Sequence, residues 1–255
     1  MIMKLEAFKS EGPPSHDLAF EDEMLDRAAD GRCSALVTSW PDPVVVLGYA
    51  QPPDDVDLDW CRDREIPVLR RLTGGTGVIH HGDLGLALAL PASHPWAEGI
   101  VGLYDRFLDV VEPALVELGS SVERIDEPRS GRRVRSPICF EDQLADTLVV
   151  DGRKAVGCSQ TRRKGGVLIH AAILLGLDAD LYARVFGVDA HRVLEGLAPA
   201  VTGVSWATVG DVILCRLARQ LELEITVAAR PDPSGEDVAV YLEDRWAPVR
   251  DGGML

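Results

Sequence analysis

The chain of 255 residues is poor in positive charge, with 26 lysine and arginine residues against 41 aspartate and glutamate residues. Its formal net charge is −15 and its isoelectric point is about 4.8. A dedicated nucleic-acid-binding protein needs a broad basic surface that displaces counterions from phosphates. The composition therefore excludes that class and predicts that basic groups of functional importance are concentrated in one pocket or patch.

The sequence also lacks long apolar runs and disulfide-type cysteine patterns. No stretch approaches the roughly 18 apolar residues of a membrane span, and residues 1–12 lack the basic and then apolar pattern of a signal peptide. The number of cysteines, five, is odd, and no two of them are spaced C-x-x-C. We therefore expect a cytoplasmic protein with reduced thiols and no membrane partner. Metal-ligand spacings such as H-E-x-x-H are missing as well, so no metal site is predicted.

The residues that are present are typical of a folded globular protein. Hydrophobic residues make up 46% of the chain and charged residues 26%. A chain of this length buries about 70–75% of its unfolded surface, so its core needs no disulfide or metal. The length is compatible with one or two domains.

The order of predicted elements favours an α+β fold with a mixed sheet, because strands and helices do not alternate regularly. Ser15 is the expected N-cap of the first helix, and Asp151-Gly152 is a strong hairpin signal. The polar, arginine-rich residues 120–136 are predicted to be an irregular loop. Helices are predicted at residues 15–30, 57–64, 99–118, 180–186, 190–197, 208–220 and 235–246, and strands at residues 35–40, 44–48, 68–72, 84–90, 144–150, 153–159, 167–175 and 223–228.

The least ordinary stretch is residues 70–83, where glycines and threonines lie between two arginines and two histidines. Glycines let a backbone approach a ligand closely and expose its N–H groups. The guanidinium groups of Arg70 and Arg71 are suited to a carboxylate or a phosphate. The stretch is neither a P-loop nor a G-x-G-x-x-G motif. A β-turn with incidental charge is the alternative, but the composition favours a ligand-binding loop.

A second unusual stretch contains Cys139 and Lys154. Arginines at residues 132–135 would favour a thiolate at Cys139 if they fold near it. Alternation along residues 153–158 predicts that Lys154 points inward, where an ammonium group needs an anionic partner. The alternatives are that Cys139 is a small buried hydrophobic residue and that Lys154 is solvated. Cys158 competes for the role of nucleophile, although its position within a strand favours a structural role.

The remaining cysteines and histidines have fewer polar residues near them in the sequence. Cys33, Cys61 and Cys215 are predicted to be structural, and His16, His94 and His191 are predicted to be surface or cap residues. A pair between a cysteine and His80, His81 or His170 remains open.

Four segments together resemble the lipoate–protein ligase and octanoyltransferase family, which shares its catalytic fold with biotin–protein ligases. Residues 70–80 are similar to the family's R-R-x-S/T-G-G-G/R-x-V-x-H loop, and residues 152–162 to its G-K/R-K-I/L/V-x-G-S/A-A/S-Q-x-R segment. Residues 168–175 are similar to L-x-H-G-S/T-I/L-L-L, and residues 40–51 to the opening strands that end in L-G-x-x-Q. The resemblance covers residues 15–177.

Departures from the family motifs distinguish its branches. Thr76 and Gly77 stand where ligases have Gly-Ala, and no asparagine follows His80 as in H-D-x-G-N. Ala171-Ala172 replaces a Gly-Thr that lies near the activated ligand in ligases. Cys139-Phe-Glu stands where ligases tend to have Asn-Asp and resembles the C-F-D/E motif of one octanoyltransferase branch, without the proline and serine that usually follow. Residues 236–246 are similar to the last helix of that branch.

The resemblance implies a mixed, largely antiparallel central sheet flanked by helices, as in biotin and lipoate–protein ligases. It also implies a single catalytic domain over residues 1–255. Residues 15–177 would be the family core, and residues 178–255 a C-terminal helical extension packed on it, with no separate accessory domain.

The favoured function is an octanoyltransferase of lipoate biosynthesis. By resemblance, the donor is octanoyl–acyl-carrier protein and the acceptor is a lysine of a lipoyl domain, such as that of the glycine-cleavage H protein. Cys139 would form an acyl thioester, and Lys154 would stabilise the negative charge on the acyl oxygen, without ATP or another cofactor. Residues 84–90 would line an acyl tunnel, and residues 129–135 would form a basic patch for acidic carriers. The implied substrate-binding residues are Arg70, Arg71, Thr73, Gly74, Gly75, Thr76, Gly77, Val78, His80, Gly157 and His170.

Three alternatives stay open. The first is an ATP-dependent lipoate–protein ligase, which would require ATP and Mg. In it, Lys154 would bind the carboxylate and α-phosphate of a lipoyl-adenylate, and Arg70 would flank the acyl group. Cys139 would have no catalytic role. An amidotransferase would move octanoyl between lipoyl domains. A non-catalytic relative would only bind lipoyl domains or adenylates.

Overall fold

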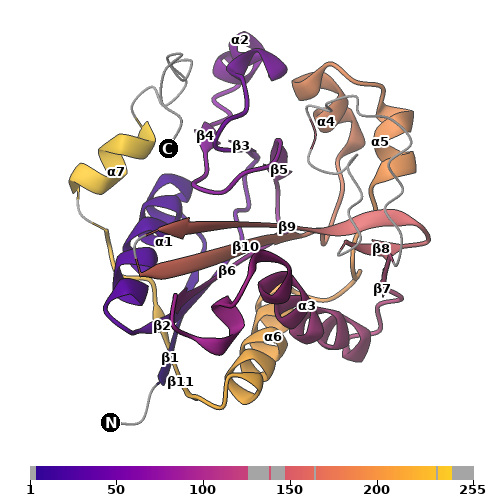
Figure 1. Cartoon of the computed structure of the whole chain (residues 1–255). Coiled ribbons are helices and arrows are strands. Elements are labelled where there is room, and N and C mark those ends of the chain that lie inside the picture. Colours follow the sequence, from indigo (N-terminus) through magenta and orange to yellow (C-terminus); the bar gives the residue numbers. More distant parts are fainter. Residues whose placement is uncertain (1–3, 126–137, 139–146, 164, 234, 243–255) are drawn as a thin grey trace.

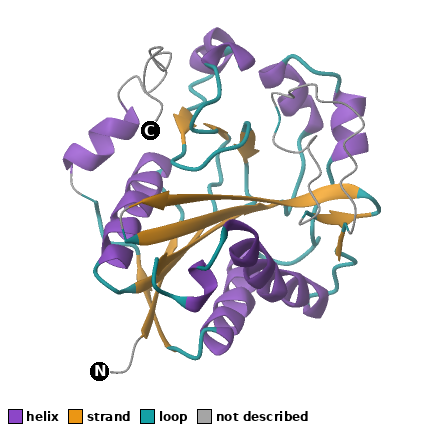
Figure 2. Cartoon of the chain, in the orientation of Figure 1, coloured by secondary structure: helices purple, strands orange, loops and turns teal. Residues whose placement is uncertain are grey.

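The computed structural model describes residues 4–125, 138, 147–163, 165–233 and 235–242. Within these residues, an eight-stranded sheet runs through the molecule and a three-stranded sheet lies beside it (Figures 1 and 2). The strands are β1 (Lys4–Ser10), β2 (Cys33–Thr38), β3 (Val44–Leu47), β4 (Val68–Arg70), β5 (Val78–His80), β6 (Leu84–Pro91), β7 (Glu123–Arg124), β8 (Leu148–Val150), β9 (Arg153–Arg163), β10 (Gly166–Ile173) and β11 (Glu224–Ala229). The α-helices are α1 (Pro14–Ala29), α2 (Leu58–Asp63), α3 (Ile100–Glu117), α4 (Ala179–Phe186), α5 (Ala190–Gly196), α6 (Trp206–Gln220) and α7 (Gly235–Leu242), and short 3-10 helices are η1 (Pro53–Asp55) and η2 (Pro95–Ala97).

The large sheet has the strand order β11-β1-β2-β6-β10-β9-β8-β7. Strand β1 is parallel to both β2 and β11, whereas the neighbours from β2 to β7 pair antiparallel. The small sheet has the order β4-β3-β5, with one parallel and one antiparallel pair. This topology confirms the predicted α+β fold with a mixed, largely antiparallel sheet.

The centre of the large sheet is buried on both faces, which is why β6 is apolar at nearly every position. Alternation sends its leucines into a core cluster with α3 and α6, and sends Ala87 and Ala89 toward α1. The small alanine side chains let α1 approach the sheet closely. Figure 1 shows α1 on one face of the sheet and the adjacent α3 and α6 on the other. A third cluster joins the small sheet to α4 and α5.

Helix α1 begins one residue earlier than predicted, and Ser15 is not its N-cap. Pro13 occupies the cap position without a side-chain hydrogen bond, and Pro14 opens the first turn. Proline is suited to that turn because its missing N–H would have no helical partner there. Ser15 is instead buried inside the helix.

The hairpin between β8 and β9 forms at Asp151 and Gly152, as predicted. Their φ angles are 51° and 73°, so both residues adopt the left-handed conformation that a tight two-residue hairpin requires. The pairing of β8 with β9 has a register irregularity between Leu148 and Val149, shortly before this turn. The hairpin thereby sets the start of β9, which carries Lys154.

Several boundaries differ from the sequence-based expectations. Strand β1 was not predicted, and β7 interrupts the expected loop at residues 120–136, of which residues 126–136 lie outside the described part. Strand β9 extends to Arg163, four residues further than expected from its short apolar portion. Strand β11 joins the large sheet beside β1, so the C-terminal region contributes a strand as well as helices. No helix in the described ranges is long and apolar enough to cross a membrane.

Candidate functional site

The glycine-rich stretch forms the connection between β4 and β5, and Arg70 braces its base. One guanidinium nitrogen of Arg70 donates to the carbonyl oxygens of Gly48 at 2.7 Å, Tyr49 at 3.0 Å and Gln51 at 2.7 Å. The side chain is buried, so these bonds compensate the loss of water around its charge. Arg70 therefore shapes the segment that follows β3.

Arg71 binds the loop itself. Its guanidinium group donates to Thr73 Oγ1 at 3.0 Å and to the carbonyl oxygens of Gly74 at 2.7 Å and Thr76 at 3.1 Å. Ser159 of β9 donates to the same Thr73 oxygen at 2.7 Å. The loop is thus tied to both sheets through one buried threonine side chain.

The backbone of the loop passes directly over Gly48. A Cβ atom at Gly48 would overlap the carbonyl group of Gly75, whose φ angle is 93°. The N–H of Tyr49 donates to the carbonyl oxygen of Thr73 at 3.0 Å, which joins the two segments further. Glycine at both positions is therefore a requirement of close backbone approach.

The end of the loop lies against the segment that precedes Cys139. Gly77 forms a parallel bridge with Ile138, and Ile138 is buried in the cluster that contains Val78 and Ile79. The sequence therefore continues from this bridge to Cys139. Cys139 itself, and the arginine-rich residues 129–135, lie outside the described residues.

Lys154 lies inside the protein, as strand alternation predicted, with only 6% of its surface exposed. It pairs with Val149 of β8 and forms a parallel bridge with Leu197 after α5. Its carbonyl oxygen accepts a hydrogen bond from the N–H of Ala198 at 3.1 Å. Gly157, three residues further along β9, is buried opposite Ala172 of β10. The lysine is thus held in a strand with neighbours on both sides.

His80 forms a buried pair with Asp83 beyond the loop. The Nδ1 atom of His80 lies 3.1 Å from Oδ1 and 2.9 Å from Oδ2 of Asp83. The ring of Trp40 meets the His80 ring edge-on, with 5.0 Å between centroids. These contacts fix the plane of the imidazole ring.

His170 forms a second buried pair of the same kind. Its Nδ1 atom lies 2.7 Å from Oε1 of Glu21 on α1. The rings of His80 and His170 meet edge-on with 6.3 Å between centroids, and Ser159 is the strand partner of His170 in β9. The two histidines and the loop threonine therefore converge from the large and small sheets on one region.

Trp40 is hydrogen-bonded to a residue of a buried ion pair. The indole N–H of Trp40 donates to Asp17 Oδ2 at 2.7 Å, and Arg230 Nε lies 2.6 Å from Asp17 Oδ1. Burial raises the pKa of Asp17, and hydrogen bonds from Ser10 and Trp40 and the charge of Arg230 oppose that rise. Trp40 is therefore the link between this ion pair and His80.

Four buried charged residues of this region had not been predicted from the sequence, namely Asp17, Glu21, Asp83 and Arg230. The signal for two of them was present, because Asp17 and Glu21 lie four residues apart and continue into the buried stripe of Leu25 and Ala28. Acidic residues within an apolar helical face indicate buried polar partners. The partners themselves lie far along the chain and have no local pattern.

Cys33 and Cys61, which were predicted to be structural, are buried. Burial raises the pKa values of Cys33 and Cys61 to about 11, with Glu6 and Asp57 adding to the respective shifts. These thiols are structural, as predicted, because a protonated thiol is a poor nucleophile. Burial also lowers the pKa of His94, and Arg106 adds to that shift. Within the described residues, no group of three or more His, Cys, Asp or Glu side chains is arranged to hold a metal ion.

Known proteins resemble this chain over most of its length. The model of the lipoyl protein ligase A/B catalytic domain matches residues 13–211. Octanoyltransferase LipM of Geobacillus kaustophilus is 32% identical over 197 residues, which cover 72% of this chain and 70% of the relative. Octanoyltransferase LipM of Moorella thermoacetica is 31% identical over 189 residues, covering 72% and 69%.

Solved structures show the same fold at lower identity. A lipoate-protein ligase A bound with ATP has a TM-score of 0.76 and 21% identity, with 96% of each chain covered. A lipoate protein ligase of Thermoplasma acidophilum, described with its E2 lipoyl domain, has a TM-score of 0.75 and 20% identity, with 100% of each chain covered. The predicted resemblance to a lipoate ligase fold is therefore confirmed.

Proposed function

The chain belongs to the family of lipoyl protein ligase A/B catalytic domains, and from this premise we propose that it is an octanoyltransferase of lipoate biosynthesis that works through a cysteine thioester. The observation that carries the proposal is the similarity to octanoyltransferases LipM over more than two thirds of the chain. The proposed donor is octanoyl–acyl-carrier protein, and the proposed acceptor is the lysine of a lipoyl domain. We place the reaction in the cytoplasm, where thiols remain reduced.

In the first step, the thiolate of Cys139 attacks the carbonyl carbon of the octanoyl thioester. A new C–S bond forms to Cys139, the C–S bond to the donor breaks, and the donor sulfur leaves as a thiolate that takes up a proton. One thioester replaces another, so the step needs no ATP. The bridge between Gly77 and Ile138 supports this assignment, because Cys139 follows Ile138 in the chain.

In the second step, the neutral amine of the acceptor lysine attacks the acyl-enzyme. A C–N bond forms, the C–S bond to Cys139 breaks with its electron pair on sulfur, and the proton lost by the nitrogen is taken up by the departing Cys139 thiolate. In both steps the carbonyl oxygen becomes negatively charged. The ammonium group of Lys154 is proposed to stabilise that charge, together with N–H groups of the glycine loop.

The two arginines and two histidines have supporting roles in this proposal. Arg70 and Arg71 hold the loop through its carbonyl groups, so that its N–H groups are oriented before the substrate arrives. The carboxylates of Asp83 and Glu21 hold the rings of His80 and His170 beside the loop. These residues are proposed to shape the acyl site. The other residues proposed to line that site are Thr73, Gly74, Gly75, Thr76, Val78 and Gly157.

The decisive experiment is an intact-mass measurement of the enzyme after mixing with octanoyl–acyl-carrier protein without ATP. We expect a mass gain of one octanoyl group in the wild type and none in Cys139→Ala. Cys158→Ala removes the rival thiol and is the matched control, which should still be acylated. Labelling of Cys139→Ala, or a wild type that gains mass only with ATP, would contradict the thioester proposal and favour the ligase reaction.

Lys154→Ala tests the oxyanion role separately. Loss of one charged donor to the developing oxyanion is expected to slow acyl-enzyme formation by about 10²-fold or more. The rate of mass gain measures this effect, and an unchanged rate would remove Lys154 from the mechanism.

A further inference from the structure

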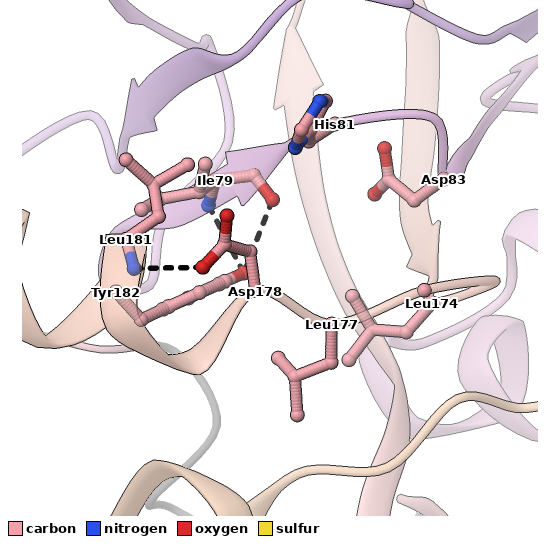
Figure 3. A pocket seen from close by; sticks show the side chains of 9 residues that line it. Ile79, His81, Asp83, Leu174, Leu177, Asp178, Leu181 and Tyr182 are labelled. Carbon is pink, nitrogen blue, oxygen red and sulfur yellow. Dashed lines mark hydrogen bonds between the residues drawn. The ribbon is translucent and has the colours of Figure 1, made fainter. Parts of the chain in front are cut away.

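A pocket of about 260 Å³ lies between the end of β5 with the turn that follows it and the start of α4. Its walls include the apolar side chains of Ile79, Leu174 and Leu181. Its polar side chains include His81, Asp83 and Asp178 (Figure 3). In Figure 3 the side chains of His81 and Asp83 lie in the upper part of the view, and Leu174 lies below them. We call it the acidic pocket.

Tyr182 of α4 fixes the shape of the acidic pocket. Its hydroxyl group accepts a hydrogen bond from the N–H of Ile79 and donates one to the carbonyl oxygen of the same residue, each at 3.1 Å. Both bonds are buried, and Figure 3 shows them joining the helix to β5. The pocket therefore has a rigid wall made from two elements that are distant in the sequence.

Asp83 has unused capacity to accept hydrogen bonds. Its side chain is 2% exposed, and its two oxygens share a single imidazole nitrogen of His80, at 3.1 and 2.9 Å. Among the described residues, no other donor reaches Oδ2 of Asp83. Oδ2 of Asp83 has almost no exposed surface, so Asp83 acts on a cation in the pocket through its charge and not through a direct hydrogen bond.

Asp178 adds a second negative charge at the opening. It is the N-cap of α4 and accepts the N–H of Leu181 at 2.9 Å. The side chain is exposed, and this bond uses one of its two oxygens. The acidic pocket thus combines two carboxylates with apolar walls, which is an environment for a cation on a hydrocarbon chain.

Residues that line the acidic pocket also contact chain neighbours of the proposed catalytic residues. The N–H of Leu174 donates to the carbonyl oxygen of Ala155 at 3.0 Å, and Ala155 follows Lys154 directly. Ile138, which precedes Cys139, belongs to the same apolar cluster as Leu174 and Ile79. A group bound in the pocket therefore lies next to the strand that carries Lys154.

We propose that the acidic pocket binds the side chain of the acceptor lysine, with its methylene groups against the apolar walls and its ammonium group at the exposed Asp178, in the field of the buried Asp83. This assignment rests on the proposed octanoyltransferase function. Two carboxylates disfavour a phosphate group, such as that of a carrier arm or an adenylate, and favour a primary ammonium group. The ammonium group loses one proton to solvent at the exposed Asp178 before the neutral amine attacks, and octanoylation then leaves a neutral amide that the pocket no longer attracts.

The test separates the two half-reactions. Wild type, Asp178→Asn and the matched control Asp189→Asn are first loaded from octanoyl–acyl-carrier protein and are then mixed with an apo lipoyl domain. Asparagine preserves an N-cap, and Asp189 is the N-cap of α5 outside the pocket. All three proteins should load at the same rate, whereas the KM for the acceptor domain should rise about tenfold in Asp178→Asn alone.

A small amine provides a direct probe of the acidic pocket. Butylamine should inhibit transfer competitively with the acceptor domain, 1-butanol should not, and Asp178→Asn should weaken inhibition by butylamine. Equal KM values in Asp178→Asn and Asp189→Asn, or equal inhibition by the amine and the alcohol, would overturn the pocket assignment. Failure of the wild type to load would instead contradict the proposed function.

A second variant tests the pocket by volume and does not depend on charge. Leu177 lines the pocket, so Leu177→Trp should fill it and slow transfer to the acceptor without slowing the loading step. Leu194→Trp changes an exposed leucine of α5 and is the control. Normal transfer by loaded Leu177→Trp would contradict binding of the lysine in this pocket.

Discussion

At the scale of single residues, the ion pair between Asp17 and Arg230 brings two opposite charges together in the interior, next to Trp40. Both side chains are almost fully buried, and Asp17 also accepts the indole N–H of Trp40. Two charges removed from water are tolerated together, because each compensates the other. The loss of either charge leaves the other without compensation.

We expect Asp17→Asn to lower the free energy of unfolding by about 3–5 kcal/mol, because it leaves the Arg230 guanidinium buried without a counter-charge. Urea unfolding measures the effect. The double variant Asp17→Asn with Arg230→Met should recover part of the loss. Arg32→Met removes an ion pair with Glu6 at the exposed surface and should cost less than about 1 kcal/mol. A similar loss in Asp17→Asn and Arg32→Met would contradict this account.

The buried thiols lead to a second prediction at this scale. A pKa of about 11 leaves Cys33 and Cys61 protonated at pH 8, with about one thiolate in a thousand. Iodoacetamide at pH 8 should therefore label the exposed Cys215 and leave both buried residues unlabelled in the native protein. Reactivity should increase only as the pH rises toward the pKa. Peptide mapping measures the labelling, and rapid modification of Cys33 or Cys61 at pH 8 would refute the prediction.

At the scale of elements, the glycine loop is rigid because two strands and two arginines hold it. The backbone of the loop packs against Gly48, and Arg71 donates hydrogen bonds to the carbonyl groups of the loop. Ser159 of the large sheet reaches the loop through Thr73. The position of its N–H groups therefore depends on the packing of β3 against the loop.

Gly48→Ala is expected to displace the loop, because a Cβ atom there overlaps the carbonyl group of Gly75. A shift of this kind should reduce acyl-enzyme formation by about 10²-fold. Gly102→Ala in α3 is the matched control, since a Cβ atom there meets nothing within 4 Å. Stopped-flow loading from octanoyl–acyl-carrier protein measures both variants. Equal loading rates would show that the loop accommodates the methyl group.

At the scale of the whole molecule, both ends of the described chain contribute to the contacts around Asp17, Trp40 and His80. Strand β11 pairs with β1 over residues 4–9, and Arg230 follows directly after β11. Through Asp17 and Trp40, Arg230 supports the ring of His80. The C-terminal region is therefore part of the structure that holds the site.

A chain that ends after Gln220 is expected to lose cooperative thermal unfolding, because it lacks both β11 and Arg230. A chain that ends after Pro233 keeps both and is the control, although it loses the packing of α7 on α1. It should unfold cooperatively at a reduced Tm. Near-ultraviolet circular dichroism measures the transitions, and equal transitions in the two shortened chains would contradict this dependence.

Local patterns predicted much of the fold. The structure contains the predicted strand at residues 84–90, the Asp151-Gly152 hairpin and the helices predicted at residues 99–118 and 208–220. The pattern did not predict β1, because its sequence has no turn signals and no clean alternation, and its partners β2 and β11 are distant in the chain. It also placed the cap of α1 at Ser15, where a proline turn opens the helix instead.

The site was predictable as far as its motifs are continuous in the sequence. The loop at residues 70–80 and the strand with Lys154 were identified because glycine, arginine and lysine are unusual there. The hydrogen bonds of Arg70 and Arg71 to backbone carbonyl groups were not predicted. Such bonds depend on chain segments that meet only in three dimensions.

The sequence by itself determined the family, the α+β class and the two stretches that carry the chemistry, because short-range patterns and motif spacing are properties of the linear chain. Only the tertiary structure decided which carboxylate meets which histidine, that Arg230 neutralises Asp17, and that Asp83 and Asp178 line one pocket. The reason is physical. Burial makes an unpaired charge costly, and its partner is selected by proximity in space, which has no representation in local sequence.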